Sequence, residues 1–388
     1  MNAGLFFGGR SVEHEVSVVT AMQVLAAMPA EHRGVPVYIA KSGAWYTGDA
    51  LRDIDSYRDV DALLRDATRV TVRPEPEGGN QLVEVGGRRG LLGGAARPVA
   101  QLDVALPLIH GSHGEDGTLQ GLFELCDLAY AGCGVAAAAV SMDKLLTKAV
   151  LRGAQLPVLD HVVIERERWA ADEAAVCAEV EKAFAPPHFV KPVSLGSSIG
   201  VTRAATREEL RAAVATALTF DSRCLVEAAQ EDIVEINCAV LGHGADVQVS
   251  VCEQPVTEGV LTYSEKYLSK GGAKDAPAGM KSARRLIPAP LDESLTRRIQ
   301  GAAVAAFQAI GAEGVARVDF LVRLGDGWFV VNELNTVPGS LSFYLWEPAG
   351  VSFSALIARL IDLAVRRHAE KQRTTYSIDS WLLRGRPS

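Results

Sequence analysis

Cysteine is scarce in this chain, and no two cysteines stand at a spacing typical of a metal site or a redox pair. The 388 residues include six cysteines, scattered through apolar stretches, with no C-x-x-C pair and no histidine at metal-ligand spacing. This pattern argues against a cysteine-based metal or redox centre. It predicts reduced, mostly buried thiols.

Long apolar runs and an excess of positive charge are also lacking. No apolar run approaches the length that spans a bilayer, and the first residues lead into a short strand with no basic, apolar signal segment. The formal net charge of −8 argues against a general binder of nucleic acid or of anionic membranes. We therefore expect a cytoplasmic protein with no nucleic-acid or membrane partner.

What the sequence does contain is typical of a globular protein with two or three domains. Hydrophobic residues make up 48% of the chain and charged residues 22%. In the first third, apolar strands at residues 5–7, 35–39 and 104–108 alternate with helical stripes such as the one around Val18. This alternation predicts an α/β fold with an open parallel sheet. Residues 70–94 are expected to form an insertion of hairpins or loops.

Residues 315–339, VARVDFLVRLGDGWFVVNELNTVPG, have the pattern of a β-hairpin with many polar groups on one face. Strand alternation places Arg317 and Asp319 on that face. Glu333 and Asn335 share a face of the return strand in the same way. If the hairpin pivots on the aspartate of its Gly-Asp-Gly turn, Asp319 lies opposite Glu333. In the same register Arg317 lies opposite Asn335, so four polar groups share one patch.

The chemistry of this patch suits a metal ion and a phosphate. Carboxylate and amide oxygens are hard ligands for Mg²⁺, which proteins usually share with substrate phosphates. The neighbouring arginine suits a transferring phosphoryl group or a developing oxyanion. The alternative is the solvated face of a surface hairpin. The turn that follows favours a site, because Gly339 at its end lets a backbone N–H approach a ligand.

A second stretch, FVKPVSLGSSIGV at residues 189–201, has the composition of a phosphate-binding loop. A strand ends near Lys191, and the small residues after it let successive backbone N–H groups approach an anion. The hydroxyls of Ser197 and Ser198 are further donors. The stretch is not a Walker loop, because its lysine precedes the glycines. The alternative is a flexible Gly/Ser turn.

Two lysines and two glutamates elsewhere are further candidates. Lys144 stands at an expected helix start, and Lys266 opens a Gly/Lys-rich stretch. Either is a binding residue or an ordinary surface lysine. Glu227 and Glu235 adjoin apolar strands, where a carboxylate is suited to accept from an adenine amino group or ribose hydroxyls. The alternative for both is a solvated strand end.

The N-terminal third offers one carboxylate and one histidine at turns. Glu13 lies at a strand-to-helix turn, where it can hold an ammonium group or cap the helix. His110, in LIHGSHGEDG, has a helix N-terminus behind it, and this arrangement can hold a carboxylate. The alternative for His110 is a loop histidine whose hydrogen bonds are satisfied within the protein.

Together, eight stretches in collinear order resemble the D-alanine–D-alanine ligases, a family of the ATP-grasp superfamily. They are GGRSVEHEVS, HGSHGEDGTLQG, AGCGVAAAAVSMDK, VKPVSLGSSIGV, EINCAVLG, EKYLS, ARVDF and NELNTVPG. The resemblance implies three domains: an N-terminal open-sheet domain over residues 1–132, a central ATP-grasp lid over 133–227, and a C-terminal ATP-grasp domain over 228–388. The ATP-grasp part would have α+β character.

The resemblance also implies roles for the nucleotide and metal ligands. ATP would be contacted by Lys144, Lys191, Ser197, Ser198, Glu227, Glu235 and Lys266. Two Mg²⁺ ions, which Mn²⁺ can replace, would be bound by Asp319, Glu333 and Asn335.

For the amino-acid substrates, the resemblance implies a second set of residues. The first D-alanine and the closing loop would be ordered by Glu13, Ser197 and Tyr267, and His110 would lie near the carboxylate of this substrate. The oxyanion site would consist of Arg317 and the Gly339 N–H.

The activity that the resemblance implies is the ATP-dependent joining of two D-alanine molecules for peptidoglycan synthesis. The first D-alanine would be phosphorylated by ATP to an acyl phosphate, which the amine of the second D-alanine attacks. An acyl phosphate hydrolyses in water, so a lid is required. Residues 267–285 have the charge and glycine content for one. The family also implies a homodimer.

One segment departs from the family pattern. After Gly339 the family continues Thr-x-x-Ser, and that serine helps to hold the carboxylate of the second substrate, whereas this chain reads Ser340-Leu341-Ser342 and is shorter. Ser342 or Ser340 can take the place of that serine. A different second substrate, such as D-serine or D-lactate, is therefore the alternative. Tyr267 favours a dipeptide, because ligases of this group that use D-lactate tend to lack it.

Two other classes of function fit the sequence less well. A dinucleotide-dependent dehydrogenase would explain the alternation of strands and helices in the first third, but the chain lacks G-x-G-x-x-G. A catalytically inactive ATP-grasp protein that senses nucleotides is disfavoured, because no residue of the expected ligand set is replaced.

Overall fold

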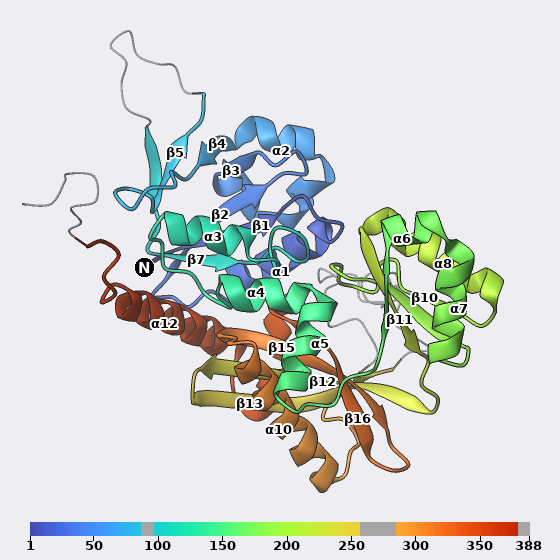
Figure 1. The fold of residues 1–388 in the computed structure, drawn as a ribbon. Coiled ribbons are helices and arrows are strands. Elements are labelled where there is room, and N and C mark those ends of the chain that lie inside the picture. The colour runs from blue at the N-terminus through green and yellow to red at the C-terminus, as the bar shows by residue number, and fades with distance from the viewer. Residues whose placement is uncertain (87–96, 257–284, 379–388) are drawn as a thin grey trace, which may run out of the picture.

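The structure is a computed structural model that describes residues 1–86, 97–256 and 285–378. Its strands form three sheets of seven, four and five strands. Figure 1 shows that the first and third sheets and their helices lie against each other, while the second sheet with its helices forms a separate lobe. The predicted α/β fold class is confirmed.

The first sheet has the strand order β6-β5-β4-β3-β2-β1-β7. Its strands are β1 (Asn2–Gly8), β2 (Arg33–Ile39), β3 (Trp45–Thr47), β4 (Thr68–Thr71), β5 (Gln81–Glu84), β6 (Pro98–Gln101) and β7 (Val104–Pro107). Strand β1 pairs in parallel with β2 and β7, and helix α1 (His14–Ala26) supplies the crossover that a parallel connection needs. The other pairs are antiparallel. Of the predicted parallel sheet, only β2, β1 and β7 are parallel. The stretch expected to form hairpins or loops contributes β5 and part of β4 as antiparallel strands of the same sheet.

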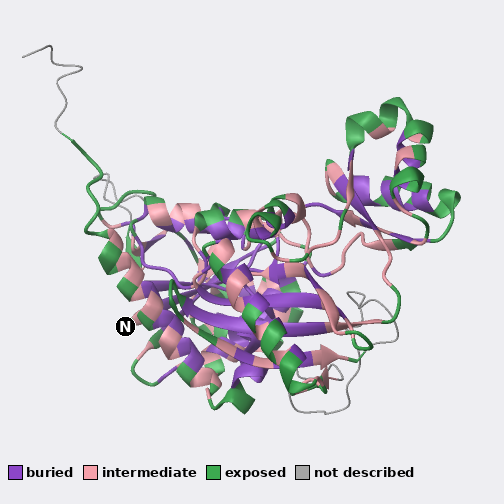
Figure 2. Ribbon diagram, turned by 60° about the horizontal axis from the view of Figure 1, so that its bottom comes forward, coloured by how far each residue is buried: buried purple, intermediate pink, exposed green. Residues whose placement is uncertain are grey.

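The second sheet is antiparallel, in the order β10-β9-β11-β8. Its strands are β8 (Val162–Glu165), β9 (His188–Pro192), β10 (Thr202–Ala204) and β11 (Arg223–Ala228). Apolar side chains of helices α7 (Glu173–Ala183) and α8 (Arg207–Phe220) pack with those of the sheet into a core of their own, and α6 (Arg166–Ala171) lies beside them. The lobe therefore has its own hydrophobic core (Figure 2).

The third sheet is also antiparallel, in the order β14-β13-β12-β15-β16. Its strands are β12 (Ile233–His243), β13 (Asp246–Pro255), β14 (Arg285–Leu286), β15 (Gly314–Arg323) and β16 (Trp328–Asn335). One face packs against α10 (Glu293–Ala309). The remaining helices are α2 (Val60–Asp66), α3 (Thr118–Leu125), α4 (Val135–Met142), α5 (Lys144–Gly153), α11 (Phe343–Trp346) and α12 (Phe353–Lys371), with short 3₁₀ turns at Asp49–Arg52, Ile54–Arg58, Gly339–Ser342 and Glu347–Ala349.

A single hydrophobic core joins the first and third sheets. Side chains of β1, such as Leu5 and Phe7, belong to the same buried cluster as Val315 of β15 and Leu356 and Leu360 of α12. The two sheets therefore share one buried interior, which is built from both ends of the chain. Figure 2 shows this continuous buried interior beside the separate lobe.

Two further observations bear on the composition-based predictions. All six cysteines are buried and unpaired, as predicted. Within the part of the chain that the structure describes, no single helix is long and apolar enough to cross a membrane. The segments Gly339–Ala349 and Phe353–Lys371 pass such a test only as a pair, with a bend of 113° between them. Their apolar side chains, including Leu345 and Trp346, lie in the shared core.

Candidate active site

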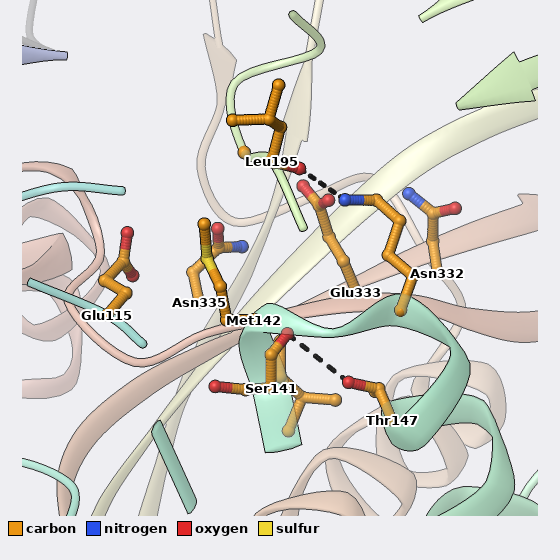
Figure 3. A pocket seen from close by; sticks show the side chains of 11 residues that line it. Glu115, Ser141, Met142, Thr147, Leu195, Asn332, Glu333 and Asn335 are labelled. Atoms are coloured by element: carbon orange, nitrogen blue, oxygen red, sulfur yellow. Dashed lines mark hydrogen bonds between the residues drawn. The ribbon is translucent and has the colours of Figure 1, made fainter. Parts of the chain in front are cut away.

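A pocket with an empty volume of about 430 Å³ lies between the N-terminal part of the chain, the lobe and the third sheet, and residues of all three line it. Its wall consists of the ends of α4 and α5, the loop after β9, the end of β16 and Glu115, which precedes α3. Figure 3 shows Glu115, Glu333 and Asn335 around this space. Three of the residues singled out in the sequence, Lys144, Glu333 and Asn335, therefore line one pocket.

The two predicted cross-strand pairs are confirmed, but the hairpin does not pivot on Asp326 as expected, because Arg323 pairs with Trp328 and Phe320 with Val331. Asp319 of β15 lies opposite Glu333 of β16, and Arg317 lies opposite Asn335. A β-bulge beside Asp319 makes Asn332 an extra residue of β16. The bulge lets Asn332 and its neighbour Glu333 line the same pocket (Figure 3). Alternation alone predicts opposite faces for two adjacent strand residues.

Arg317 and Asp319 form a buried, bidentate ion pair. Arg317 Nε and Nη2 donate to the two carboxylate oxygens at 2.6 Å each, and Asn335 Nδ2 donates to Asp319 Oδ2 at 2.9 Å. Burial raises the pKa of Asp319 to about 7, although the guanidinium lowers it; the charges of Glu235 and Glu333 contribute to the rise. When the pKa of a carboxyl group is raised in this way, a cation that binds nearby stabilises the carboxylate form.

Glu227 joins two lysines at the base of the lobe. Lys148 Nζ lies 2.6 Å from one carboxylate oxygen of Glu227, and Lys191 Nζ lies 2.7 Å from the other. Lys191 also donates to Asn332 Oδ1 at 3.1 Å. Burial would raise the pKa of Glu227, but the two ammonium groups lower it to about 2. With both oxygens facing lysines, Glu227 fixes the position of Lys191 in this structure.

Lys144 contributes a third ammonium group to the same region. Its Nζ donates to the Leu195 carbonyl. Burial lowers its pKa, and the nearby carboxylate of Glu333 opposes that change. Lys144, Lys148 and Lys191 thus bring three ammonium groups to one region, where Glu227, Glu333 and Asp221 supply the opposite charge. Ammonium groups of this kind can contact the phosphates of a bound ligand.

The Ser/Gly loop between β9 and β10 reaches the N-terminal sheet. Ser197 and Ser198 have φ angles of 52° and 58°, in a left-handed region that L-residues rarely adopt. The buried hydroxyl of Ser197 donates to the carboxylate of Glu13, which precedes α1 and is also buried. The two residues that the sequence analysis grouped, 184 positions apart, are therefore in contact.

His110 is buried and held from both sides of its ring. Its Nδ1 lies 2.8 Å from the Val337 carbonyl, and its Nε2 lies 2.9 Å from Thr20 Oγ1. Because a carbonyl only accepts, Nδ1 carries the proton and Nε2 accepts from the Thr20 hydroxyl. Burial lowers the pKa of His110 to about 4, so the ring is neutral at neutral pH.

Glu115 is a site residue that sequence reasoning missed. It accepts from the backbone N–H groups of Gly111 at 2.8 Å and Val337 at 2.9 Å. Burial, followed by the negative charge of Glu13, raises the pKa of Glu115 to about 8. A carboxyl group with so high a pKa beside a pocket is typical of a functional site. Only its place in HGEDG, before an expected helix, could have drawn attention to it.

Asn332 and Lys148 were also missed. Asn332 lies in the bulge, which strand alternation does not predict. Lys148 stands four residues after Lys144 on α5, so helical spacing places both on one face, and this signal was available in the sequence.

The segment after Gly339 has an unusual backbone. Ser340, Leu341 and Ser342 have φ angles of 53°, 52° and 52°, and each left-handed L-residue costs about 1–2 kcal/mol. All three are buried, with exposed fractions of 2%, 5% and 0%. The Ser342 hydroxyl is buried without a hydrogen-bond partner in the described structure. We call residues Ser340, Leu341 and Ser342 the left-handed turn.

Some predicted site residues are not tested by these contacts. Lys266 and Tyr267, together with most of the expected closing segment, lie outside the described residues. Glu235 lies half-buried on β12, opposite Leu321, near enough to Asp319 to raise its pKa. Ser198 is half-buried in the Ser/Gly loop.

The donor set suits a divalent metal ion. Asp319, Glu333 and Asn335 offer two carboxylates and an amide, the hard oxygens that Mg²⁺ prefers. Among the described residues, no group of three histidine, cysteine, aspartate or glutamate side chains is arranged to hold a metal ion.

Comparisons with known proteins agree with this architecture. Family models described as the D-ala D-ala ligase N-terminus and C-terminus match residues 2–133 and 150–362. The chain is 35% identical to a D-alanine–D-alanine ligase of Thermosipho africanus, over 98% of this chain and 97% of the relative. It is 37% identical to one of Shouchella clausii, over 97% of each chain.

Solved structures give the same result. A D-alanine-D-alanine ligase from Coxiella burnetii is 30% identical and superposes with a TM-score of 0.76 over 96% of this chain and 97% of its own. The VanG D-Ala:D-Ser ligase from Enterococcus faecalis is also 30% identical, with a TM-score of 0.77 over 94% and 99%. The fold and the site thus define an ATP-grasp ligase. The chain belongs to the D-alanine–D-alanine ligase family.

Proposed function

We propose that this protein joins two D-alanine molecules at the expense of ATP, forming the carbon–nitrogen bond of D-alanyl-D-alanine for peptidoglycan synthesis. Family membership over nearly the whole chain supports this activity. The observation that carries the proposal is that Lys144, Glu333 and Asn335 line one pocket. Asn335 joins this lining to the buried Arg317–Asp319 pair, and Asn332 joins it to Lys191. The chemistry of carboxylate activation needs each of these groups.

ATP would bind between the lobe and the third sheet. The family uses ATP with a divalent metal ion. Lys144 and Lys191 would contact its phosphates, together with Lys266 and the Ser/Gly loop, and Glu235 would contact the ribose. By family resemblance, Glu227 would contact the adenine. It also holds the Lys191 ammonium group in place through an ion pair.

The hairpin oxygens of Asp319, Glu333 and Asn335 would hold two Mg²⁺ ions, or Mn²⁺ in their place. A bound divalent ion would offset charge on the triphosphate during phosphoryl transfer.

The first D-alanine would lie beside the N-terminal sheet. Glu13, held by the Ser197 hydroxyl, would accept hydrogen bonds from its ammonium group, with Tyr267 completing this set. The neutral ring of His110 would lie near its carboxylate. After phosphorylation of that carboxylate, Arg317 and the Gly339 N–H would stabilise the oxyanion formed when the second amine attacks.

The second substrate would bind at the left-handed turn. The Ser342 hydroxyl is fully buried and has no hydrogen-bond partner in the described part of the chain. Leaving a buried hydroxyl unpaired costs about 1–3 kcal/mol, which a substrate carboxylate would recover. Ser340, whose backbone N–H is already bonded to Thr20, is the other candidate.

A second candidate function is the joining of D-alanine to a different second substrate. Structural likeness to a D-Ala:D-Ser ligase at 30% identity supports D-serine, and so does the shortened segment after Gly339. D-lactate is a further alternative. The difference between these products lies in a single atom or hydroxyl group, so only product analysis separates them.

The larger-scale proposals follow from the family. Residues 1–132, 133–227 and 228–388 would act as N-terminal domain, lid and C-terminal domain. The three described sheets follow these ranges, except that β11 ends at Ala228, one residue past the second range. Two chains would form a homodimer, and the enzyme would act in the cytoplasm.

Product analysis tests the activity. The protein is incubated with Mg²⁺, ATP and D-alanine, alone or with D-serine or D-lactate, and products are identified by mass spectrometry. We expect D-alanyl-D-alanine and ADP only when all three components are present. Glu333→Gln, which replaces a carboxylate ligand by a neutral amide, should abolish both while circular dichroism stays unchanged. Release of ADP without any dipeptide or depsipeptide would contradict the proposal.

A further inference from the structure

A buried polar cluster lies behind the left-handed turn and takes no part in the roles assigned above. Tyr344, two residues after Ser342, donates from its hydroxyl to Glu253 Oε1 at 3.0 Å. The guanidinium of Arg285 lies 4.3 Å from the centre of the Tyr344 ring and donates from Nη1 to Glu253 Oε2 at 3.0 Å. Glu253 and Tyr344 are 1% and 7% exposed.

This cluster is joined to the metal-binding strands. Asn237 of β12 donates from Nδ2 to Glu253 Oε1 at 3.2 Å. In the sheet, Asn237 lies between Glu253 of β13 and Asp319 of β15, opposite each. Tyr344 is therefore bonded to β13, and Asn237 of β12 lies between that strand and β15, which carries Arg317 and Asp319.

The left-handed turn needs such an anchor. Three consecutive L-residues in a left-handed conformation persist only where the surroundings hold them. At its start the turn is held by two hydrogen bonds, from Ser340 N to Thr20 Oγ1 at 3.2 Å and from Leu341 N to the Pro338 carbonyl at 2.8 Å. At the end of the turn, the Phe343 N–H donates to the Ser340 carbonyl, and the Phe343 ring stacks on Phe353 at 4.4 Å. The backbone bond lies within the segment itself, whereas Tyr344 bonds this side of the turn to the third sheet.

We propose that Tyr344, held by Glu253 and Arg285, is a positioning residue that fixes the left-handed turn and thereby sets the affinity for the second D-amino acid. This inference rests on the proposed ligase function. It concerns the second substrate specifically, because the lysine cluster and Glu13 lie on other elements and make no contact with Tyr344 in the described structure.

Position supports the same conclusion. The turn begins at Gly339, whose N–H is assigned to the oxyanion site, and Thr20 links Ser340 to His110. A displaced turn would therefore misplace the second amine relative to the reacting carboxyl group, while the first substrate and ATP keep their contacts.

The test compares two tyrosines. Tyr344→Phe removes the hydroxyl bond to Glu253 and keeps the ring under Arg285. Tyr57→Phe is the matched control, because Tyr57 also donates to a protein oxygen, the Leu51 carbonyl at 2.9 Å. Tyr57 is a half-buried residue of the N-terminal part that packs against the shared core. The readouts are KM for each D-alanine site, KM for ATP, kcat and melting temperature.

For Tyr344→Phe we expect KM for the second D-alanine to rise about tenfold, equivalent to about 1.4 kcal/mol, with KM for ATP and for the first D-alanine within about twofold. Tyr57→Phe should change none of the three. Glu253→Gln, which keeps an acceptor but removes the charge that pairs with Arg285, should raise the same KM less. An unchanged second-site KM in Tyr344→Phe, or an equal rise in all three KM values, would overturn the inference.

A measurement without substrate separates this inference from the function. Hydrogen exchange is followed in a peptide covering residues 338–346, which contains the bonded amides of Ser340 and Leu341. Tyr344→Phe should speed its exchange about tenfold, and Tyr57→Phe should not. If the unmodified protein forms no product, the proposed ligase function is wrong. The hydrogen-exchange comparison still tests whether Tyr344 holds the left-handed turn. Equal exchange in both variants would refute the anchoring role.

Discussion

His110 shows how burial decides charge in this site. Its ring nitrogens are bonded to Val337 and Thr20, Arg317 is near, and no described carboxylate is bonded to it. Burial, with a smaller contribution from Arg317, lowers the pKa of His110 to about 4. The opposite case is Glu115, whose pKa burial raises to about 8. The sequence identified His110 as a candidate but could not give its charge, because charge depends on burial and on neighbours distant in sequence.

This pKa predicts a pH dependence of stability. The native pKa of His110, about 4, lies below the ordinary value of 6.5, so the unfolded chain binds an additional proton between these limits. The neutral ring therefore stabilises the fold fully above pH 6.5, by about 3 kcal/mol, and this contribution is lost as pH falls to about 4. His110→Gln should lack this loss, as measured by urea unfolding at several pH values. Parallel pH curves for the two proteins would contradict it.

Helix α5 shows how a local signal places site residues. Asp143 precedes it, accepts from the N–H groups of Leu145 and Leu146 at 2.9 and 3.0 Å, and pairs with Arg223 of β11 at 2.7 Å. The sequence predicted a helix start here, because aspartate before an apolar run is a common N-cap. The cap fixes the first turn, which carries Lys144, and with it the orientation of Lys148.

Removing this cap should weaken nucleotide binding as well as stability. Asp143→Ala loses the cap and the Arg223 pair, so we expect a loss of about 1–2 kcal/mol in the free energy of unfolding and a several-fold weaker affinity for ADP, measured by calorimetry.

The matched control for the cap is Asp292→Ala. Asp292 caps α10 by accepting from Leu295 N at 2.8 Å, and no lysine of the site lies on that helix. It should lose comparable stability with unchanged ADP affinity. Equal effects on affinity in both variants would show that the cap of α5 does not place the lysines.

Other elements were beyond prediction from sequence. The hairpin does not pivot on Asp326 as assumed, and its strands are one residue out of the predicted register between the turn and the bulge, which restores it. The pairs of Asp319 with Glu333 and of Arg317 with Asn335 did follow from the sequence. The bulge at Asn332 did not, because its signal is a one-residue mismatch between two strands. The left-handed turn did not either, since serine and leucine rarely adopt that conformation. Tertiary contacts from Thr20 and Tyr344 impose it.

At the scale of the whole molecule, the structure joins the first and third sheets rigidly and leaves the second as a lobe with its own core (Figure 1). The pocket lies where the lobe meets this shared body, and Lys191 of the lobe bonds to Asn332 of the body. Strand and helix alternation predicted the α/β class. It could not give the antiparallel half of the first sheet, because direction depends on connection lengths that periodicity does not report.

The most direct test of this account is a crystal structure with Mg²⁺ and a non-hydrolysable ATP analogue. We expect Mg²⁺ density within bonding distance of Glu333 and Asn335 oxygens, shared with the phosphates, and the ammonium groups of Lys144 and Lys191 directed at the same phosphates. Nucleotide bound elsewhere, with the Asp319, Glu333 and Asn335 side chains far from any phosphorus atom, would contradict the central claim.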